Sequence, residues 1–137
     1  AYVTDEGLAE MAAANEGLRK ALTTSEAAEQ DYRFHLALAD AAKNEVLSRM
    51  YRVMAEPMRF YLEVGKSHRP ATDTAHEQHA RIIDALAARD AARLADELST
   101  HFQHSSDTLA HWLASRAEED TPLTLWPPQE AATGSSV

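Results

Sequence analysis

The amino-acid sequence predicts an all-α fold for a single globular domain. Alanine and leucine are abundant, only 4 glycines occur and β-branched residues are sparse, a bias that favours helices over strands. Hydrophobic residues recur at spacings of three, four and seven, which is the period of an amphipathic helix. A chain of 137 residues with 45% hydrophobic and 26% charged residues can bury a core as one domain. About five to six helices are expected.

The first two predicted helices begin at recognisable caps. Thr4 can cap a helix that runs to about Ala21, and the segment Thr23-Thr-Ser-Glu26 matches a capping box that starts the second helix. Asn44 suits the left-handed residue that commonly ends a helix, so a turn is expected near 43–45. The apolar stripe of the first helix consists of Leu8, Met11, Leu18 and Leu22. Asn15 interrupts this stripe and is expected to be a boundary residue or a local hydrogen bonder.

A third helix is predicted over about 45–66, with a kink at Pro57. Its apolar stripe is broad, which indicates contacts on more than one side and predicts a homodimer. The opposite face alternates in charge and is typical of a solvated, salt-bridged surface, although Arg59 is also a candidate anion-binding residue. The segment Gly65-Lys-Ser-His-Arg-Pro70 is predicted to be a loop.

The fourth and fifth helices are predicted to form an antiparallel hairpin around Asp90. The fourth begins at one of Thr72, Asp73 or Thr74 and runs to about Arg89, and the fifth covers about 91–116. Residues 1–120 are expected to form the helical domain. Residues 121–137, rich in Pro, Gly and Ser, are expected to form a tail.

Charge and composition exclude several classes of function. The formal charge of −9, with no cluster of Lys or Arg, makes this segment an unlikely nucleic-acid binder by itself. Cysteine is absent, so any metal must be held by His, Asp or Glu. Neither a membrane span nor a signal peptide is recognisable, so a cytoplasmic location is the default expectation. The abrupt start without Met is compatible with a domain taken from a longer protein.

Four polar side chains are predicted to point into the core and to hold a metal. Asp31 and His35 lie four residues apart and leave the same helix face. His79 and His101 lie eleven residues before and after Asp90, each on an apolar stripe, so they should meet across the hairpin. One carboxylate and three imidazoles suit Zn or Ni, with Mn, Fe and Co as further options. The alternative is a set of hydrogen-bonded core histidines.

Three further histidines rank behind this set. His76 and His104 lie one turn from His79 and His101 and can replace either, but their helical phase places them nearer solvent. His111 shares the outer face of His104 and is expected to be structural or solvated.

The order and spacing of these residues resemble a known family. The pattern consists of Asp31-x-x-x-His35, Leu38-Ala-x-Ala-Ala-x-Asn44, Gln78-His79-x-x-Ile82, Asp90 and His101. From about Leu8 to Leu113 the chain is similar to the C-terminal effector-binding domain of FadR-type regulators of the GntR superfamily, called the FCD domain. Lys43 stands where the family favours a small residue, and Gln78 replaces a frequent Glu. The opening helix that is usual in the family is expected to be missing from this chain.

The resemblance implies an antiparallel helical bundle, a metal held by the matching Asp and three His, and a small carboxylic-acid effector at that metal. It also implies a homodimer and a preceding winged-helix DNA-binding domain, which this chain lacks, so that DNA is a partner only through that missing domain. Asn44 and Arg59 are candidate effector-binding residues. The expected effector is a small carboxylate or hydroxy acid.

A metalloenzyme acting on a small organic acid is the main alternative function. Di-metal carboxylate bundles need Glu-x-x-His pairs, and no histidine here has Glu three residues before it. The segment His76-Glu-Gln-His79 is one residue shorter than the zincin motif. A metal-free interaction bundle is a further alternative. The sequence therefore predicts a sensor domain and not a catalyst.

Overall fold

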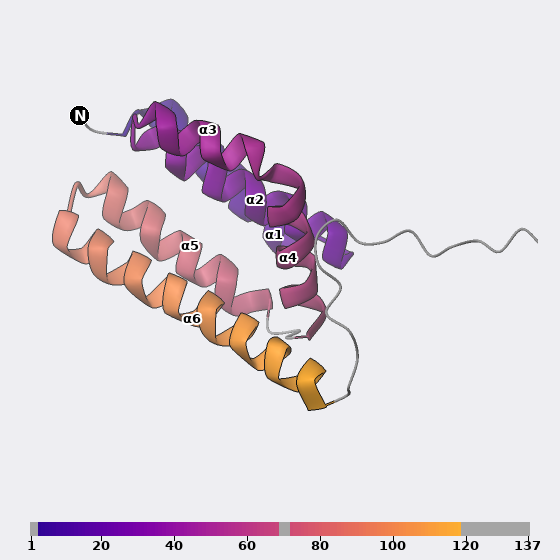
Figure 1. Ribbon diagram of the computed structural model, residues 1–137. Helices are drawn as coiled ribbons and strands as arrows, with labels where there is room; N and C mark the ends of the chain where they lie inside the picture. The colour runs from indigo at the N-terminus through magenta and orange to yellow at the C-terminus, as the bar shows by residue number, and fades with distance from the viewer. Residues whose placement is uncertain (1–2, 69–71, 119–137) are drawn as a thin grey trace, which may run out of the picture.

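The computed structural model, which describes residues 3–68 and 72–118, contains six α-helices and no strand in these ranges (Figure 1). The all-α prediction is therefore confirmed. The helices are α1 (Asp5–Lys20), α2 (Thr24–Ala41), α3 (Glu45–Val53), α4 (Ala55–His68), α5 (Thr72–Ala87) and α6 (Ala91–Glu118). None of these described helices combines the length and apolarity that a bilayer crossing requires. The predicted tail at 121–137 lies outside the described residues.

The helices run up and down as an antiparallel bundle (Figure 1). Helix α2 packs against α1, α3 and α4, and α5 packs against both α1 and α6. The centre of the core is formed by side chains from α1, α2 and α5, namely Met11, Ala14, Phe34, Ala37 and Ile82. The polar residues of the candidate site lie next to this cluster because they are on the inward faces of α2, α5 and α6.

Helices α1 and α2 begin at the N-caps that the sequence predicts. The Thr4 hydroxyl accepts a hydrogen bond from the Gly7 amide, and Thr23 does the same for the Glu26 amide. The Glu26 carboxylate accepts from the Leu22 amide at 2.9 Å, which completes the capping box one residue earlier than the usual position. Leu22 was expected in the buried stripe but lies in the link between the helices, where it is 92% exposed.

The link between α2 and α3 differs from the expectation. Lys43, not Asn44, adopts the left-handed conformation, with φ of 53°. Asn44 is instead the N-cap of α3, and its side-chain oxygen accepts a hydrogen bond from the Leu47 amide at 3.1 Å. The amide-bearing side chain is therefore used to start the next helix and not to end the previous one.

The single third helix predicted over 45–66 is in fact two helices that meet at Met54. Proline cannot donate a hydrogen bond to the carbonyl four residues earlier, and its ring clashes with that carbonyl. For Pro57 this residue is Val53, the last residue of α3, so the break lies upstream of the proline. The loop predicted over 65–70 is also wrong for residues 65–68, because α4 continues through Gly65 to His68. Arg69, Pro70 and the His68 side chain lie outside the described part.

The α5–α6 hairpin forms as predicted around Asp90. Arg89 takes a left-handed φ of 57°, and the Asp90 carboxylate accepts a hydrogen bond from the Arg93 amide at 3.0 Å. Thr74 lies inside α5 and so does not cap it. With 28 residues against 16, α6 extends past the start of α5 (Figure 1). This overhang leaves part of the α6 apolar stripe to face α4.

Candidate metal centre

Helix α2 supplies two of the four predicted ligands. Asp31 and His35 are both buried, and the His35 Nε2 lies 3.2 Å from the Asp31 Oδ1. They face inward because they share the α2 face on which Ala28 is also buried. A carboxylate and an imidazole are thus held together in the interior of the bundle.

The hairpin supplies the other two ligands, at equal height as predicted. His79 on α5 is 0% exposed and His101 on α6 is also buried. Their ring centroids lie 4.9 Å apart. The His79 Nε2 lies 3.6 Å from the Asp31 Oδ1, and the His101 Nε2 lies 3.2 Å from the His35 Nε2. The structure therefore brings all four sequence-predicted ligands to one point.

Three of the distances between these atoms are close to those expected around a single bound ion. Ligand atoms held at about 2.0–2.1 Å from one metal lie about 2.9–3.4 Å apart for octahedral to tetrahedral geometry. Two of the measured distances, both 3.2 Å, fall in this range and the third, at 3.6 Å, lies just above it. One ligand atom from each of the three histidines lies within 4.8 Å of the others.

Four buried atoms of these residues lack a hydrogen-bond partner, and two of the four lie where the side chains converge. These two are the Asp31 Oδ1 and the His79 Nε2, both of which face the centre of the cluster. A buried polar atom without a partner costs about 1–3 kcal/mol, so native proteins rarely leave one unsatisfied. A metal ion at the centre satisfies both atoms at once. The residues present therefore fit a divalent transition metal.

The protonation states also suit a metal. Burial lowers the pKa of His79 well below its ordinary value, and burial together with the nearby His35 lowers the pKa of His101 to about 4. Burial alone would raise the pKa of Asp31, but the contact with His35 and the charge of Lys66 lower it well below its ordinary range. At neutral pH, His79 and His101 are uncharged and Asp31 is ionised, as metal ligands must be.

Two neighbours orient the imidazoles. The His101 Nδ1 lies 2.8 Å from the Oε1 of buried Gln78, to which its N–H donates, so the Nε2 lone pair is left for a metal. The His79 ring stacks on Phe34, with centroids 3.7 Å apart and planes 8° from parallel. Sequence analysis noted Gln78 only as a departure from the family pattern. Its position one residue before His79 places it across the hairpin from His101.

The sequence analysis missed Lys66, which completes the polar cluster. It is only 9% exposed, and its Nζ donates to the Asp31 Oδ2 at 2.6 Å. Lys66 occupies one carboxylate oxygen and leaves the Oδ1 directed at the histidines. The signal in the sequence was the spacing of Met58, Leu62 and Lys66, which share one helical stripe if the helix continues through Gly65.

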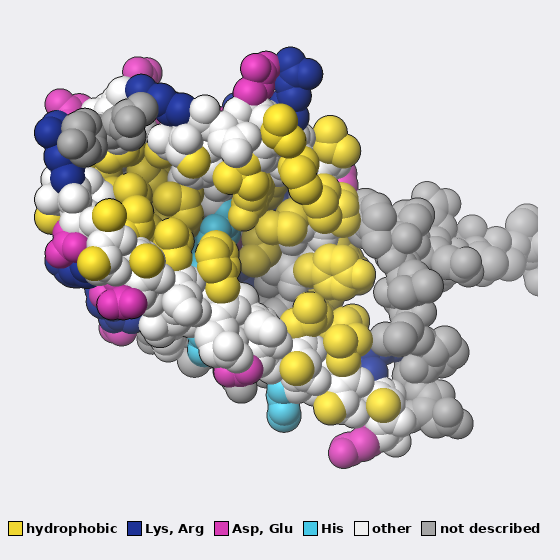
Figure 2. Space-filling model, turned by 60° about the vertical axis from the view of Figure 1, so that its left-hand side comes forward, with side chains coloured by type: hydrophobic (Ala, Val, Ile, Leu, Met, Phe, Trp, Pro, Cys, Tyr) yellow, Lys and Arg dark blue, Asp and Glu magenta, His cyan; other side chains and the backbone are white. Residues whose placement is uncertain are grey.

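A cavity of about 230 Å³ opens beside this cluster, between α4 and α6. Asp31, His35 and His101 line one end of it together with Lys66. The remaining wall is largely apolar, with Met58, Leu62, Leu109 and Trp112 among the side chains that line it. Figure 2 shows a histidine side chain in the floor of a hollow with hydrophobic side chains on both sides. A ligand in the cavity would therefore meet the cluster directly.

The secondary candidate histidines lie outside the converging set. The His76 backbone carbonyl accepts a hydrogen bond from the buried Asn15 side chain at 3.0 Å, which links α5 to α1. His104 is partly buried and lines the cavity, but its ring is not part of the convergent group. His111 is exposed. The ranking of His79 and His101 ahead of them agrees with this geometry.

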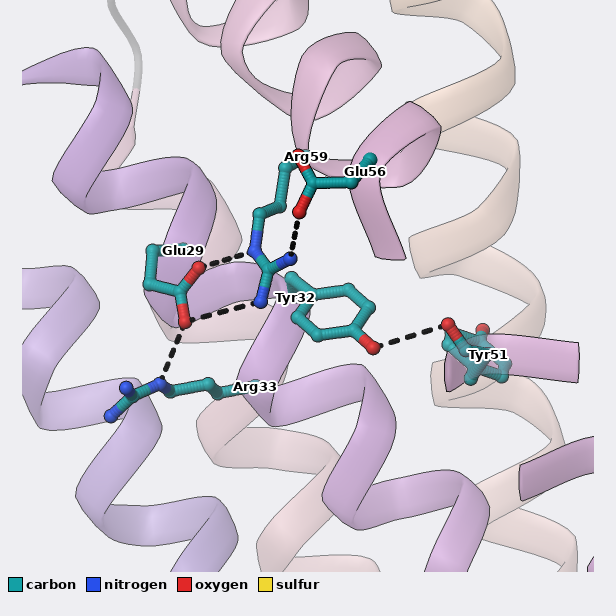
Figure 3. A network of polar contacts seen from close by, with 6 residues as sticks. All are labelled: Glu29, Tyr32, Arg33, Tyr51, Glu56 and Arg59. Carbon is teal, nitrogen blue, oxygen red and sulfur yellow. Dashed lines mark hydrogen bonds and ion pairs between the residues drawn. The ribbon is translucent and has the colours of Figure 1, made fainter. Parts of the chain in front are cut away.

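The two candidate effector residues lie elsewhere. Arg59 pairs with Glu29 on α2 and with Glu56, and its guanidinium lies 4.4 Å from the centre of the Tyr32 ring (Figure 3). Asn44 is exposed and caps α3. Neither is among the described residues that line the cavity. Their role toward an effector stays a prediction, and the network in Figure 3 gives Arg59 a role in tying α4 to α2.

Comparison with known proteins gives two matches. Residues 2–104 match the family model described as the FCD domain. Over 93 residues the chain is 29% identical to the HTH-type transcriptional regulator LutR of Bacillus subtilis (strain 168), an alignment that covers 64% of this chain and 42% of that protein. The chain thus spans less than half the length of this curated relative. No solved structure matches the chain.

Proposed function

Because the chain belongs to the FCD domain family, we propose that it is the effector-sensing and dimerisation domain of a GntR-type transcriptional regulator. The similarity to a protein named as an HTH-type transcriptional regulator supports this role. With a net charge of −9, these residues are poorly suited to bind DNA themselves. DNA contact is therefore assigned to a winged-helix domain in the parent protein, with a cytoplasmic location.

The proposed sensor holds one divalent transition metal through Asp31, His35, His79 and His101. Zn and Ni are the first candidates and Mn, Fe and Co the next, because imidazole and carboxylate donors suit all of them. The observation that carries the proposal is the convergence of four buried donors, two of which lack a hydrogen-bond partner. When bound, the ion supplies positive charge and coordination positions that a carboxylate can occupy.

The chain's own residues prepare the site for an acid. Lys66 holds the outer oxygen of Asp31, and Gln78 fixes the His101 ring. Three of the four proposed ligands, Asp31, His35 and His101, line the cavity and can be reached by a small molecule in it. The fourth, His79, is fully buried. A small carboxylate or hydroxy acid is therefore the proposed effector. The binding of this acid changes the affinity for the operator only if the acid binds two arrangements of the helical bundle with different affinities.

Homodimerisation through α3 is the second part of the proposal. Several apolar side chains of α3 and the α3–α4 junction are at least one-third exposed, and they are Val46, Leu47, Met50, Val53 and Met54. A contiguous apolar helix face of this kind is typical of a protein–protein interface. Symmetric pairing of two copies is the commonest way to cover it.

The test is a thermal-shift measurement of small organic acids with metal-loaded and metal-stripped protein. We expect acids to raise the melting temperature of the loaded protein and to have little effect on the stripped protein. Equal stabilisation in both forms would refute metal-mediated recognition. Steady turnover of a bound acid would favour the metalloenzyme alternative, so the same samples should be analysed for products.

A further inference from the structure

The cavity beside the metal centre has two chemically different ends. From this difference we infer that the effector is a monocarboxylic acid of about six carbons, which lies along α4 and α6 with its carboxylate at the candidate metal centre. This inference rests on the proposed function and adds the class of acid. It excludes small polar hydroxy acids and acids with two or three carboxylates as preferred effectors.

The polar end offers one binding point for a carboxylate, which is the proposed metal. Among the described residues that line the cavity, Asp31 and Lys66 are the only ones of the Asp, Glu, Lys and Arg type. They are already paired with each other at 2.6 Å. The proposed metal is therefore the cation that a carboxylate would meet at that end. A second carboxylate placed further along the cavity would meet no cationic Lys or Arg among the described residues that line it.

The far end of the cavity offers few free polar groups. Its walls are formed largely by Met58, Leu62, Leu109 and Trp112. The hydroxyl protons of two polar residues in the wall are already used, because Ser105 donates to the His101 carbonyl and Thr108 to the His104 carbonyl. The Tyr61 hydroxyl and the His104 ring also line the cavity, but these few groups cannot replace the hydration of an ionised or hydroxyl-rich tail. An apolar tail gains from the same surface.

The size of the cavity sets the length of the apolar body. An engineered cavity of about 150 Å³ in another protein accommodates benzene. The present cavity, at about 230 Å³, has room for a five-carbon chain or a ring together with a carboxylate. Acids of two or three carbons would leave most of the apolar wall in contact with water.

The first experiment compares three probes on the metal-loaded full chain by isothermal titration calorimetry. Hexanoate should bind more tightly than propionate, by about fourfold for each methylene that the wall covers, up to about 60-fold for three. Adipate has the same six carbons but a second carboxylate at the far end, and it should bind at least about tenfold more weakly than hexanoate. Hexanoate is thus the matched probe for adipate.

A charge introduced at the far end should reverse this preference. Leu109 lines the cavity and is 42% exposed, so Leu109→Lys should fold, and it should bind adipate more tightly than hexanoate. Leu113→Lys is the matched control. Leu113 lies one turn further along α6 with 41% exposure and does not line the cavity, so this variant should keep the original preference.

The possible results separate the inference from the proposed function. Tighter binding of adipate or propionate than of hexanoate to the unaltered chain would overturn the inference but leave a metal-based acid sensor. An unchanged preference in Leu109→Lys would also overturn it. No binding of any acid to the metal-loaded chain would overturn the proposed function and the inference together.

Discussion

Replacement of His79 with Ala tests the metal centre most directly. A metal present at about 1,000 times its dissociation constant stabilises the folded chain by about 4 kcal/mol, and this contribution should disappear in the variant. In metal-free protein the change should be much smaller. The lost packing against Phe34, about 2–4 kcal/mol, is partly offset because the variant removes a buried imidazole whose nitrogens lack hydrogen-bond partners, at about 1–3 kcal/mol.

The assay is metal content by elemental analysis together with thermal unfolding, each with and without EDTA. EDTA should lower the melting temperature of the wild type by roughly 12 °C, at about 3 °C per kcal/mol for a domain of this size, and should hardly affect His79→Ala. His111→Ala is the matched control. Because His111 is exposed, this variant should retain the metal content of the wild type. Wild-type metal content in His79→Ala, or a wild type unaffected by EDTA, would refute the reasoning.

Three further predictions concern the surroundings of the site. Gln78→Ala should weaken metal binding about 10- to 100-fold in a chelator competition assay, because the His101 ring loses its orienting partner. Glu29→Gln should lower the free energy of unfolding by about 1 kcal/mol at pH 7, by breaking the pair with Arg59. Partial burial alone would raise the pKa of Glu29, but the hydrogen bond from Arg59 lowers it below 4.5 in the folded protein. The greater free energy of unfolding of the wild type should therefore be complete above about pH 4.5 and should vanish as the pH falls through the lowered pKa of the folded state. Urea titrations at several pH values measure this difference. Val53→Lys, at a side chain 84% exposed on α3, should give a monomer by light scattering, whereas Leu22→Lys should leave the mass of the wild type unchanged.

Features encoded over a few neighbouring residues could be predicted from the sequence. The caps at Thr4, Thr23 and Asp90 depend on a side chain and an amide three residues away, and all three form. The meeting of His79 and His101 follows from equal distance to one turn, and it also holds. These predictions succeed because the geometry of a helix and of a short hairpin is nearly independent of the rest of the chain.

Features that depend on tertiary packing could not be predicted. Gly65 and Pro70 favour a loop locally, but α4 continues because packing against α2 and α6 buries Lys66. The position of the break at Met54 follows from an effect of Pro57 on a carbonyl four residues away, which sequence analysis had assigned to the proline itself. The cavity arises where the α6 overhang faces α4, and no single segment encodes it.

The break at Met54 places two surfaces of the proposed sensor on different helices. Helix α3 carries the exposed apolar face, and α4 carries Lys66 at the cavity. The proposed dimer surface and the cavity wall therefore belong to separate helices. Arg59 pairs with Glu29 near this break, and Lys66 pairs with Asp31 near the other end of α4, so that α4 is held to α2 at both ends. Any tilt of α4 that alters the packing of α3 couples the two surfaces, and such coupling is reciprocal. The affinity for the acid should therefore change with protein concentration across the range in which the dimer forms.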